Sequence, residues 1–133
     1  QNRIRRWIKR RCLAMGKPKL VPFDSVEHQE RRPGVFLTSL VDGGTGATQI
    51  SSGLAEFSVG TSAPTHYHNA EESVIVVEGE GLVVINGEEH VVKPHDGIFI
   101  TPGAHHSIAN HGDKPFKISW TYASINWTTT PVD

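Results

Sequence analysis

The chain has 133 residues, 37% hydrophobic and 20% charged, a composition that fits one globular domain and excludes a disordered chain. Its single cysteine, Cys12, excludes an internal disulfide framework and a cysteine-based zinc cluster. No apolar run approaches the roughly 20 residues needed to span a bilayer, and the apolar core of a secretory signal peptide is missing. We therefore expect a cytoplasmic protein with no membrane partner.

The formal net charge of −1 hides an uneven distribution of charge. The first 20 residues hold eight basic residues and no acid. The other 113 hold five basic and fourteen acidic residues, a formal charge of −9. Because an acidic body repels the phosphate backbone, we expect no nucleic-acid partner.

The basic N-terminal segment precedes the predicted fold. In the stretch RIRRWIKRRC, Ile4, Trp7 and Ile8 recur at helical spacing among cations, as in helices that bind anionic lipids or nucleic acids. Short basic runs are unspecific, however, and we interpret residues 1–17 as an extension outside the fold. Met15 is the single methionine, so residues 1–14 are either native or a vector-derived or upstream extension.

Residues 18–133 are predicted to form one all-β domain. Short runs rich in β-branched residues alternate with turn residues, and the chain holds 13 Gly and 8 Pro. The expected strands are Lys19–Phe23, Val35–Val41, Leu54–Val59, Ser73–Glu78, Leu82–Ile85, Glu89–Val92, Gly97–Ile100, His106–Ala109 and Phe116–Tyr122. Short strands joined by tight turns favour a sandwich or a jelly-roll barrel.

One turn and one strand carry the clearest local signals. Asn86-Gly87 separates two β-branched runs by two residues, which is typical of a tight β-hairpin. Along the last strand, large apolar residues alternate with polar ones, and this period of two predicts one buried face. The residues of that face are Phe116, Ile118, Trp120 and Tyr122.

Two histidines and a glutamate fall close together in the middle of the chain. His66 and His68 are two residues apart, so on an extended chain both imidazoles point to one side. Glu72 returns to that side at the start of the next strand, whereas Glu71 would need a shift of register. Two imidazole nitrogens and a carboxylate oxygen that converge in this way suit a divalent transition metal ion.

A third nitrogen ligand is predicted from a pair of adjacent histidines, His105 and His106. Neighbouring residues of a strand face opposite sides, so only one of the two can point inward. Alternation along the strand groups His106 with Ile108 and Asn110. We therefore predict His106 as the third imidazole ligand.

The first of these stretches resembles the first motif of the cupin superfamily without a gap. The matching residues are Gly60, His66, His68, Glu72 and Gly79, separated by five, one, three and six residues. The resemblance is specific because the residue types and the spacings coincide together.

Residues 96–110 resemble the second cupin motif. Gly103, His106 and Asn110 stand at the expected offsets. The chain departs from the family at His95, where the family usually has Gly, and at Thr101, where it usually has Pro. These two changes concern the geometry of turns rather than the metal ligands.

The resemblance implies a double-stranded β-helix, or jelly-roll barrel, with a site of three His and one Glu inside. That site would hold one divalent transition metal ion, either Fe, Mn, Ni, Zn or Cu. The implied function is an enzyme that acts on a small oxygenated organic molecule, as a dioxygenase-type oxidoreductase or as an isomerase or lyase. The alternatives are a non-enzymatic module that binds a sugar-like ligand through the metal, and a storage or structural cupin.

Two further residues are candidates for catalysis, namely Tyr122 and His95, since each could lie near the metal. Small cupins commonly pair or exchange edge strands, which covers exposed backbone groups. The resemblance therefore implies a homodimer, and residues 18–41 are the candidate segment for the pairing.

Overall fold

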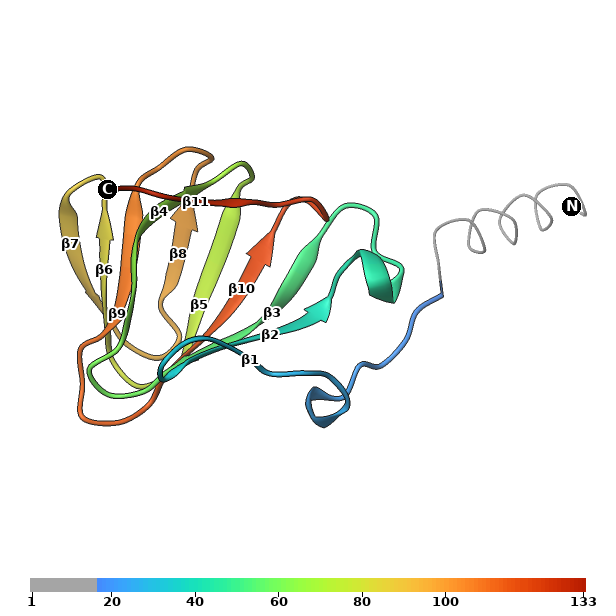
Figure 1. Ribbon diagram of the computed structural model, residues 1–133, viewed down its shortest axis with the longest axis horizontal. Coiled ribbons are helices and arrows are strands. Elements are labelled where there is room, and N and C mark those ends of the chain that lie inside the picture. Colours follow the sequence, from blue (N-terminus) through green and yellow to red (C-terminus); the bar gives the residue numbers. More distant parts are fainter. Residues whose placement is uncertain (1–16) are drawn as a thin grey trace, which may run out of the picture.

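Two antiparallel sheets make up the computed structural model, which describes residues 17–133 (Figure 1). The six-stranded sheet has the order β1(Gln29–Arg32), β2(Val35–Val41), β3(Ser51–Phe57), β10(Phe116–Tyr122), β5(Glu72–Glu78) and β8(Gly97–Ile100). The five-stranded sheet has the order β11(Thr129–Pro131), β4(Ser62–His68), β9(His106–Asn110), β6(Gly81–Ile85) and β7(Glu88–Val92). The predicted all-β jelly roll is confirmed.

Helical structure in the described residues is limited to two 3₁₀ turns, η1(Phe23–Ser25) and η2(Gly43–Thr45). No helix in this part of the chain has the length and apolar character to cross a membrane. The predicted extension over residues 1–17 falls almost wholly outside the described residues, and the domain boundary at residue 18 stays a prediction.

The core lies between the inner faces of the two sheets, and β10 contributes the largest side chains. Phe116, Ile118, Trp120 and Tyr122 are 0–5% exposed, so the predicted buried face of the last strand is confirmed. The other core residues come from both sheets and, in the case of Ala104, from the loop before β9. They are Val35, Ala55, Phe57, Val74, Val76, Val83, Val92, Ile100, Ala104 and Ile108.

The hairpin between β6 and β7 forms where the sequence predicts it. Asn86 and Gly87 have φ angles of 49° and 85°, and the flanking residues Ile85 and Glu88 are paired. Two successive positive φ angles match the twist of the strands on either side.

One predicted strand, Lys19–Phe23, is absent, and this prediction was wrong. Leu20 is 86% exposed, and the chain enters the turn η1 at Phe23 with Pro22 as its N-cap. A strand needs a partner for its backbone groups, and proline removes one of the donors. Local apolar character alone therefore did not make this segment a strand.

Three strands were not predicted, namely β1, β4 and β11. β1 is a fully exposed run of polar residues that pairs with β2. β4 contains Pro64, beside an irregularity in the pairing with β9 between Ala63 and His66. Proline is tolerated at such a position because no ladder hydrogen bond is required of it.

Candidate metal centre

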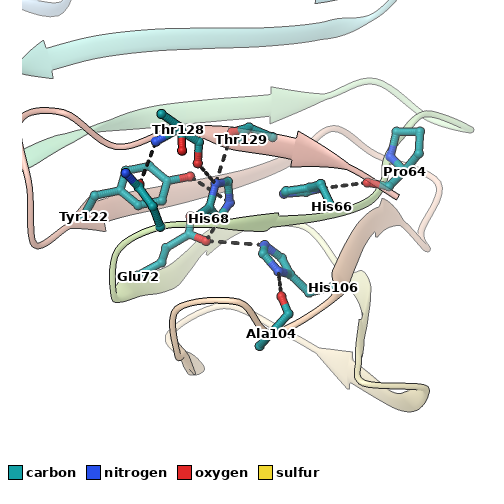
Figure 2. Close-up of polar contacts among 10 residues, drawn as sticks. Pro64, His66, His68, Glu72, Ala104, His106, Tyr122, Thr128 and Thr129 are labelled. Carbon is teal, nitrogen blue, oxygen red and sulfur yellow. Dashed lines mark hydrogen bonds and ion pairs between the residues drawn. The ribbon is translucent and has the colours of Figure 1, made fainter. Parts of the chain in front are cut away.

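One strand end and two strand starts bring the predicted ligands together inside the barrel (Figure 2). His66 and His68 lie at the C-terminal end of β4. Glu72 and His106 are the first residues of β5 and β9. Glu72 and His68 are each 4% exposed, and His106 is 1% exposed. His66 is partly exposed and stands on the solvent side of the cluster.

The distances among the three histidines are short enough for a single ion to touch all of them, and the Glu72 carboxylate lies beside two of them. The ligand nitrogens of His66, His68 and His106 all lie within 4.8 Å of one another. Glu72 Oε1 lies 3.4 Å from His68 Nε2 and 3.5 Å from His106 Nε2. The four predicted residues therefore form one cluster, which we call the histidine–glutamate cluster.

Each imidazole of the cluster is held through its Nδ1 atom by a backbone carbonyl. The acceptors are Pro64 O at 2.6 Å from His66, Thr128 O at 3.0 Å from His68, and Ala104 O at 2.9 Å from His106. A carbonyl oxygen can only accept, so each Nδ1 carries the proton. The lone pair of every neutral ring is then on Nε2, which faces the interior of the cluster.

This tautomer leaves acceptors facing acceptors at the centre of the site. Glu72 Oε1 and His106 Nε2 are buried and have no hydrogen-bond partner among the described residues. A buried acceptor without a donor costs roughly 1–3 kcal/mol. A cation between these atoms removes that cost, and three imidazole nitrogens with one carboxylate oxygen fit a divalent transition metal ion.

Burial favours the neutral form of two of the imidazoles, those of His66 and His68. Burial lowers the pKa of His66 to about 4, although its hydrogen bond to Pro64 O acts in the opposite direction. Burial also lowers the pKa of His68, against the attraction of Glu72. Neutral imidazole is the form that binds metal ions, so these two rings are ready to act as ligands at neutral pH.

Of the two candidate catalytic residues, the structure brings only Tyr122 to the cluster. Tyr122 is 5% exposed, and its hydroxyl lies 3.2 Å from His68 Nε2, to which it can donate. Burial raises the pKa of Tyr122, and the neighbouring Glu72 carboxylate raises it further. The phenol is therefore a hydrogen-bond donor beside the cluster.

His95 lies away from the cluster, in the turn between β7 and β8. Its side chain is exposed, and its backbone N–H donates to Val76 O, four residues beyond Glu72 along β5. Its φ angle is 78°, a left-handed conformation that glycine adopts without strain. This explains in physical terms why a glycine is the usual residue at the corresponding cupin position.

The alternation argument for the two adjacent histidines agrees with the structure. His106 points inward, whereas His105 is exposed and stacks on Tyr67 at 5.4 Å between ring centroids. The backbone N–H of His105 donates to the side chain of Asn86, in the hairpin turn after β6.

Sequence reasoning missed the residues of the C-terminal segment that contact the cluster. Trp127 stacks on Tyr122 with ring centroids 4.2 Å apart and meets His68 edge-on at 6.0 Å. Thr128 supplies the carbonyl that accepts from His68, and Thr129 Oγ1 lies 3.1 Å from the same nitrogen. The run Trp-Thr-Thr-Thr is β-prone, but nothing in it indicates that its partner is β4.

An apolar groove of about 580 Å³ lies elsewhere, over β2, β3, β5 and β10. Its apolar walls come from Phe23, Phe36, Leu54 and Val77. No residue of the histidine–glutamate cluster lines this groove, so its size has no bearing on the chemistry of the cluster.

Comparisons with known proteins agree with this geometry. The family model described as "Cupin domain" matches residues 53–122. The chain is 30% identical over 99 residues to the tetracenomycin polyketide synthase protein TcmJ of Streptomyces glaucescens, covering 74% of this chain and 66% of that protein. It is 33% identical to the polyketide synthase CurC of Streptomyces cyaneus, covering 77% and 67% of the two chains. This chain thus spans about two thirds of the length of these relatives.

A solved structure with a similar fold is the polyketide cyclase RemF from Streptomyces resistomycificus. The TM-score is 0.76 at 24% sequence identity, and the match covers 88% of this chain and 87% of RemF. The likeness extends over nearly the whole of both chains and shows a shared fold.

Proposed function

This chain belongs to the cupin family, and from that premise we propose that it is a metal-dependent enzyme acting on a small oxygenated organic molecule. The proposed ligands of its divalent transition metal ion are His66, His68, Glu72 and His106. The observation that carries this proposal is the pair of buried acceptors without donors, Glu72 Oε1 and His106 Nε2, beside the Nε2 atom of His68.

A divalent metal ion held there would supply Lewis acidity toward a carbonyl or enolate oxygen or, as iron or manganese, redox chemistry with dioxygen. The chain's own residues prepare the site. The carbonyls of Pro64, Ala104 and Thr128 fix the orientation of the imidazole rings. The Tyr122 hydroxyl lies beside the cluster, where it can donate a hydrogen bond to a substrate oxygen.

The enzyme is favoured over the binding module by Tyr122. A module that only binds its ligand needs no proton-bearing group next to the metal, whereas this cluster has a buried hydroxyl 3.2 Å from one of its ligand atoms. The names of the relatives favour a polyketide-like substrate, that is, a compound with several carbonyl or phenol oxygens. Isomerase or lyase chemistry on such a compound is our first proposal, and a dioxygenase reaction is the second.

The proposal is tested on protein purified without chelators. Elemental analysis should find about one transition metal ion per chain, and its content should fall in His66→Ala and His106→Ala. His105→Ala is the matched control, because His105 is adjacent but exposed. Turnover of phenolic and polyketone compounds is then measured with and without dioxygen. Metal-free protein that turns over substrate as fast as the metal-loaded form would contradict the proposal.

Binding without turnover, by contrast, would support the non-enzymatic module. In that case metal-loaded protein would bind a sugar-like or polyketide-like ligand in calorimetry, yet leave it unchanged after long incubation.

The homodimer also stays a proposal. β1 is an exposed edge strand within residues 18–41, and sedimentation of the full chain at several concentrations measures its mass.

A further inference from the structure

We propose that residues 124–131, which we call the C-terminal strap, are a positioning element that fixes the orientation and tautomer of His68, with Asn69 as the residue that holds the strap. This inference deepens the proposed function and rests on it. The strap lies beyond residues 53–122, the part of the chain that the family model matches.

The strap lies directly against the strand that carries two of the proposed ligands. β11 pairs with β4 so that Thr129 is opposite His68 and Pro131 is opposite His66. Figure 1 shows β11 running along β4 at the end of the chain. Any displacement of β11 therefore changes the surroundings of the strand that carries His66 and His68.

His68 depends on the strap in a way that the other two histidines do not. The carbonyls that accept from His66 and His106 belong to residues only two positions away, Pro64 and Ala104. The carbonyl that accepts from His68 belongs to Thr128, 60 residues away in the sequence. The local backbone accepts from the Nδ1 atoms of two of the rings, whereas the Nδ1 atom of the third has its carbonyl acceptor only if the strap is in place (Figure 2).

Asn69, the residue after His68, fastens the strap with two hydrogen bonds. Its Nδ2 donates to Asn126 O at 3.2 Å, and its Oδ1 accepts from the Thr128 N–H at 2.8 Å. These bonds bracket Trp127, whose ring stacks on Tyr122. The backbone of Thr128, whose carbonyl accepts from His68, is thus held on one side by Asn69 and on the other by the pairing of Thr129 with His68.

Loss of this support should weaken metal binding without unfolding the barrel. Removing a partner that orients a metal-binding histidine typically costs about 10- to 100-fold in metal affinity. Asn69 is exposed, so truncating its side chain leaves no cavity in the core. We expect Asn69→Ala to bind Zn²⁺ about 10- to 100-fold more weakly than wild type.

The experiment uses the full chain, freed of metal and titrated with Zn²⁺ in competition with a chromophoric chelator. Asn69→Ala removes both bonds, and Asn69→Asp keeps the acceptor for the Thr128 N–H and should lose less affinity. Thr129→Val removes the hydroxyl next to His68. The matched control is Asn126→Ala, because Asn126 contacts Asn69 through its backbone and its side chain makes no hydrogen bond among the described residues.

A second readout does not depend on metal. In the metal-free protein, ¹⁵N spectra of the imidazoles should show His68 as the Nδ1–H tautomer in wild type and Asn126→Ala, and as a mixture in Asn69→Ala. The tautomers of His66 and His106 should not change. Unchanged His68 spectra in Asn69→Ala, or Zn²⁺ affinity equal to that of Asn126→Ala, would overturn the role of the strap. If wild type bound no metal ion at all, the proposed function would fail, while the His68 spectra would still decide this inference.

Discussion

Glu72 Oε1 faces His68 Nε2 at a distance of 3.4 Å, and both atoms are hydrogen-bond acceptors. The same oxygen lies 3.5 Å from His106 Nε2, which is an acceptor because Ala104 O holds the proton of that ring on Nδ1. Acceptors at such distances repel one another through their partial charges. The fold therefore holds these groups in an arrangement that costs free energy unless a cation lies between them.

Replacing the Glu72 carboxylate by its amide should change the stability of the metal-free protein and its affinity for metal in opposite directions. In Glu72→Gln the amide can donate to Nε2 of His68 or His106. The free energy of unfolding of the metal-free protein should then rise by about 1 kcal/mol, the net value of a hydrogen bond. The affinity for Zn²⁺ should fall by at least about tenfold. Thermal unfolding in the presence of chelator and a Zn²⁺ titration measure the two effects.

Glu71→Gln is the control for this prediction, because Glu71 is exposed and next to Glu72 in the sequence. Glu71→Gln should change neither the free energy of unfolding nor the affinity for Zn²⁺. A Glu72→Gln protein that is less stable without metal, and that binds Zn²⁺ as well as wild type does, would show that the carboxylate has a purely structural role.

The fold was predicted from the sequence where one strand face is buried and the pattern has a period of two. β10 is the clearest case, because its four large apolar residues face the core. β1 and β11 could not be predicted in this way, because all their residues are exposed and no alternation marks them. Their strand conformation comes from pairing with β2 and β4. Such pairing leaves no hydrophobic pattern in the sequence of the strand itself.

The cluster was predictable for a similar reason. His66 and His68 share a face because they are two residues apart, and alternation placed His106 rather than His105 inside. The support of His68 by Thr128 and Asn69 was not predictable, since it joins positions about 60 residues apart. Sequence spacing shows which side chains can converge on one strand face, but not which distant backbone group holds a ring in place.

Metal addition should stabilise the chelator-treated protein. A ligand that binds only the folded state adds about 2.7 kcal/mol to the free energy of unfolding at a free concentration 100 times its dissociation constant. For a domain of this size, the melting temperature should rise by roughly 10 °C. Differential scanning calorimetry with Zn²⁺ measures the shift. Mg²⁺ is the control, because it prefers oxygen ligands and should have little effect. Equal shifts with Zn²⁺ in wild type and in His106→Ala would contradict the assignment of His106.

The turn before β8 contains a strained residue that can be relieved. His95 has a φ angle of 78° and an exposed side chain, whereas glycine takes this conformation freely. His95→Gly should raise the free energy of unfolding by about 1 kcal/mol, the cost of the left-handed conformation for other residues. His111→Gly is the control, since His111 is also exposed but has no positive φ. Denaturant unfolding measures both, and Zn²⁺ affinity should stay at the wild-type value. A destabilised His95→Gly protein would mean that the imidazole makes a contact worth more than the strain.

Gly53 is predicted to be the least replaceable glycine of the sheet that carries β10. A Cβ atom at this position would overlap the backbone carbonyl of Thr38 on β2 and come within 2.6 Å of the Trp120 ring. Neither neighbour can retreat, because Thr38 is paired with β3 and Trp120 is 2% exposed in the core. Gly53→Ala should therefore lower the free energy of unfolding by about 2 kcal/mol or more, as overpacked cores do. Gly97→Ala on β8 is the control, because a Cβ there meets no atom within 4 Å. Denaturant unfolding of the metal-free protein compares the two, and equal stabilities would mean that β2 and β3 can separate at Gly53 at little cost.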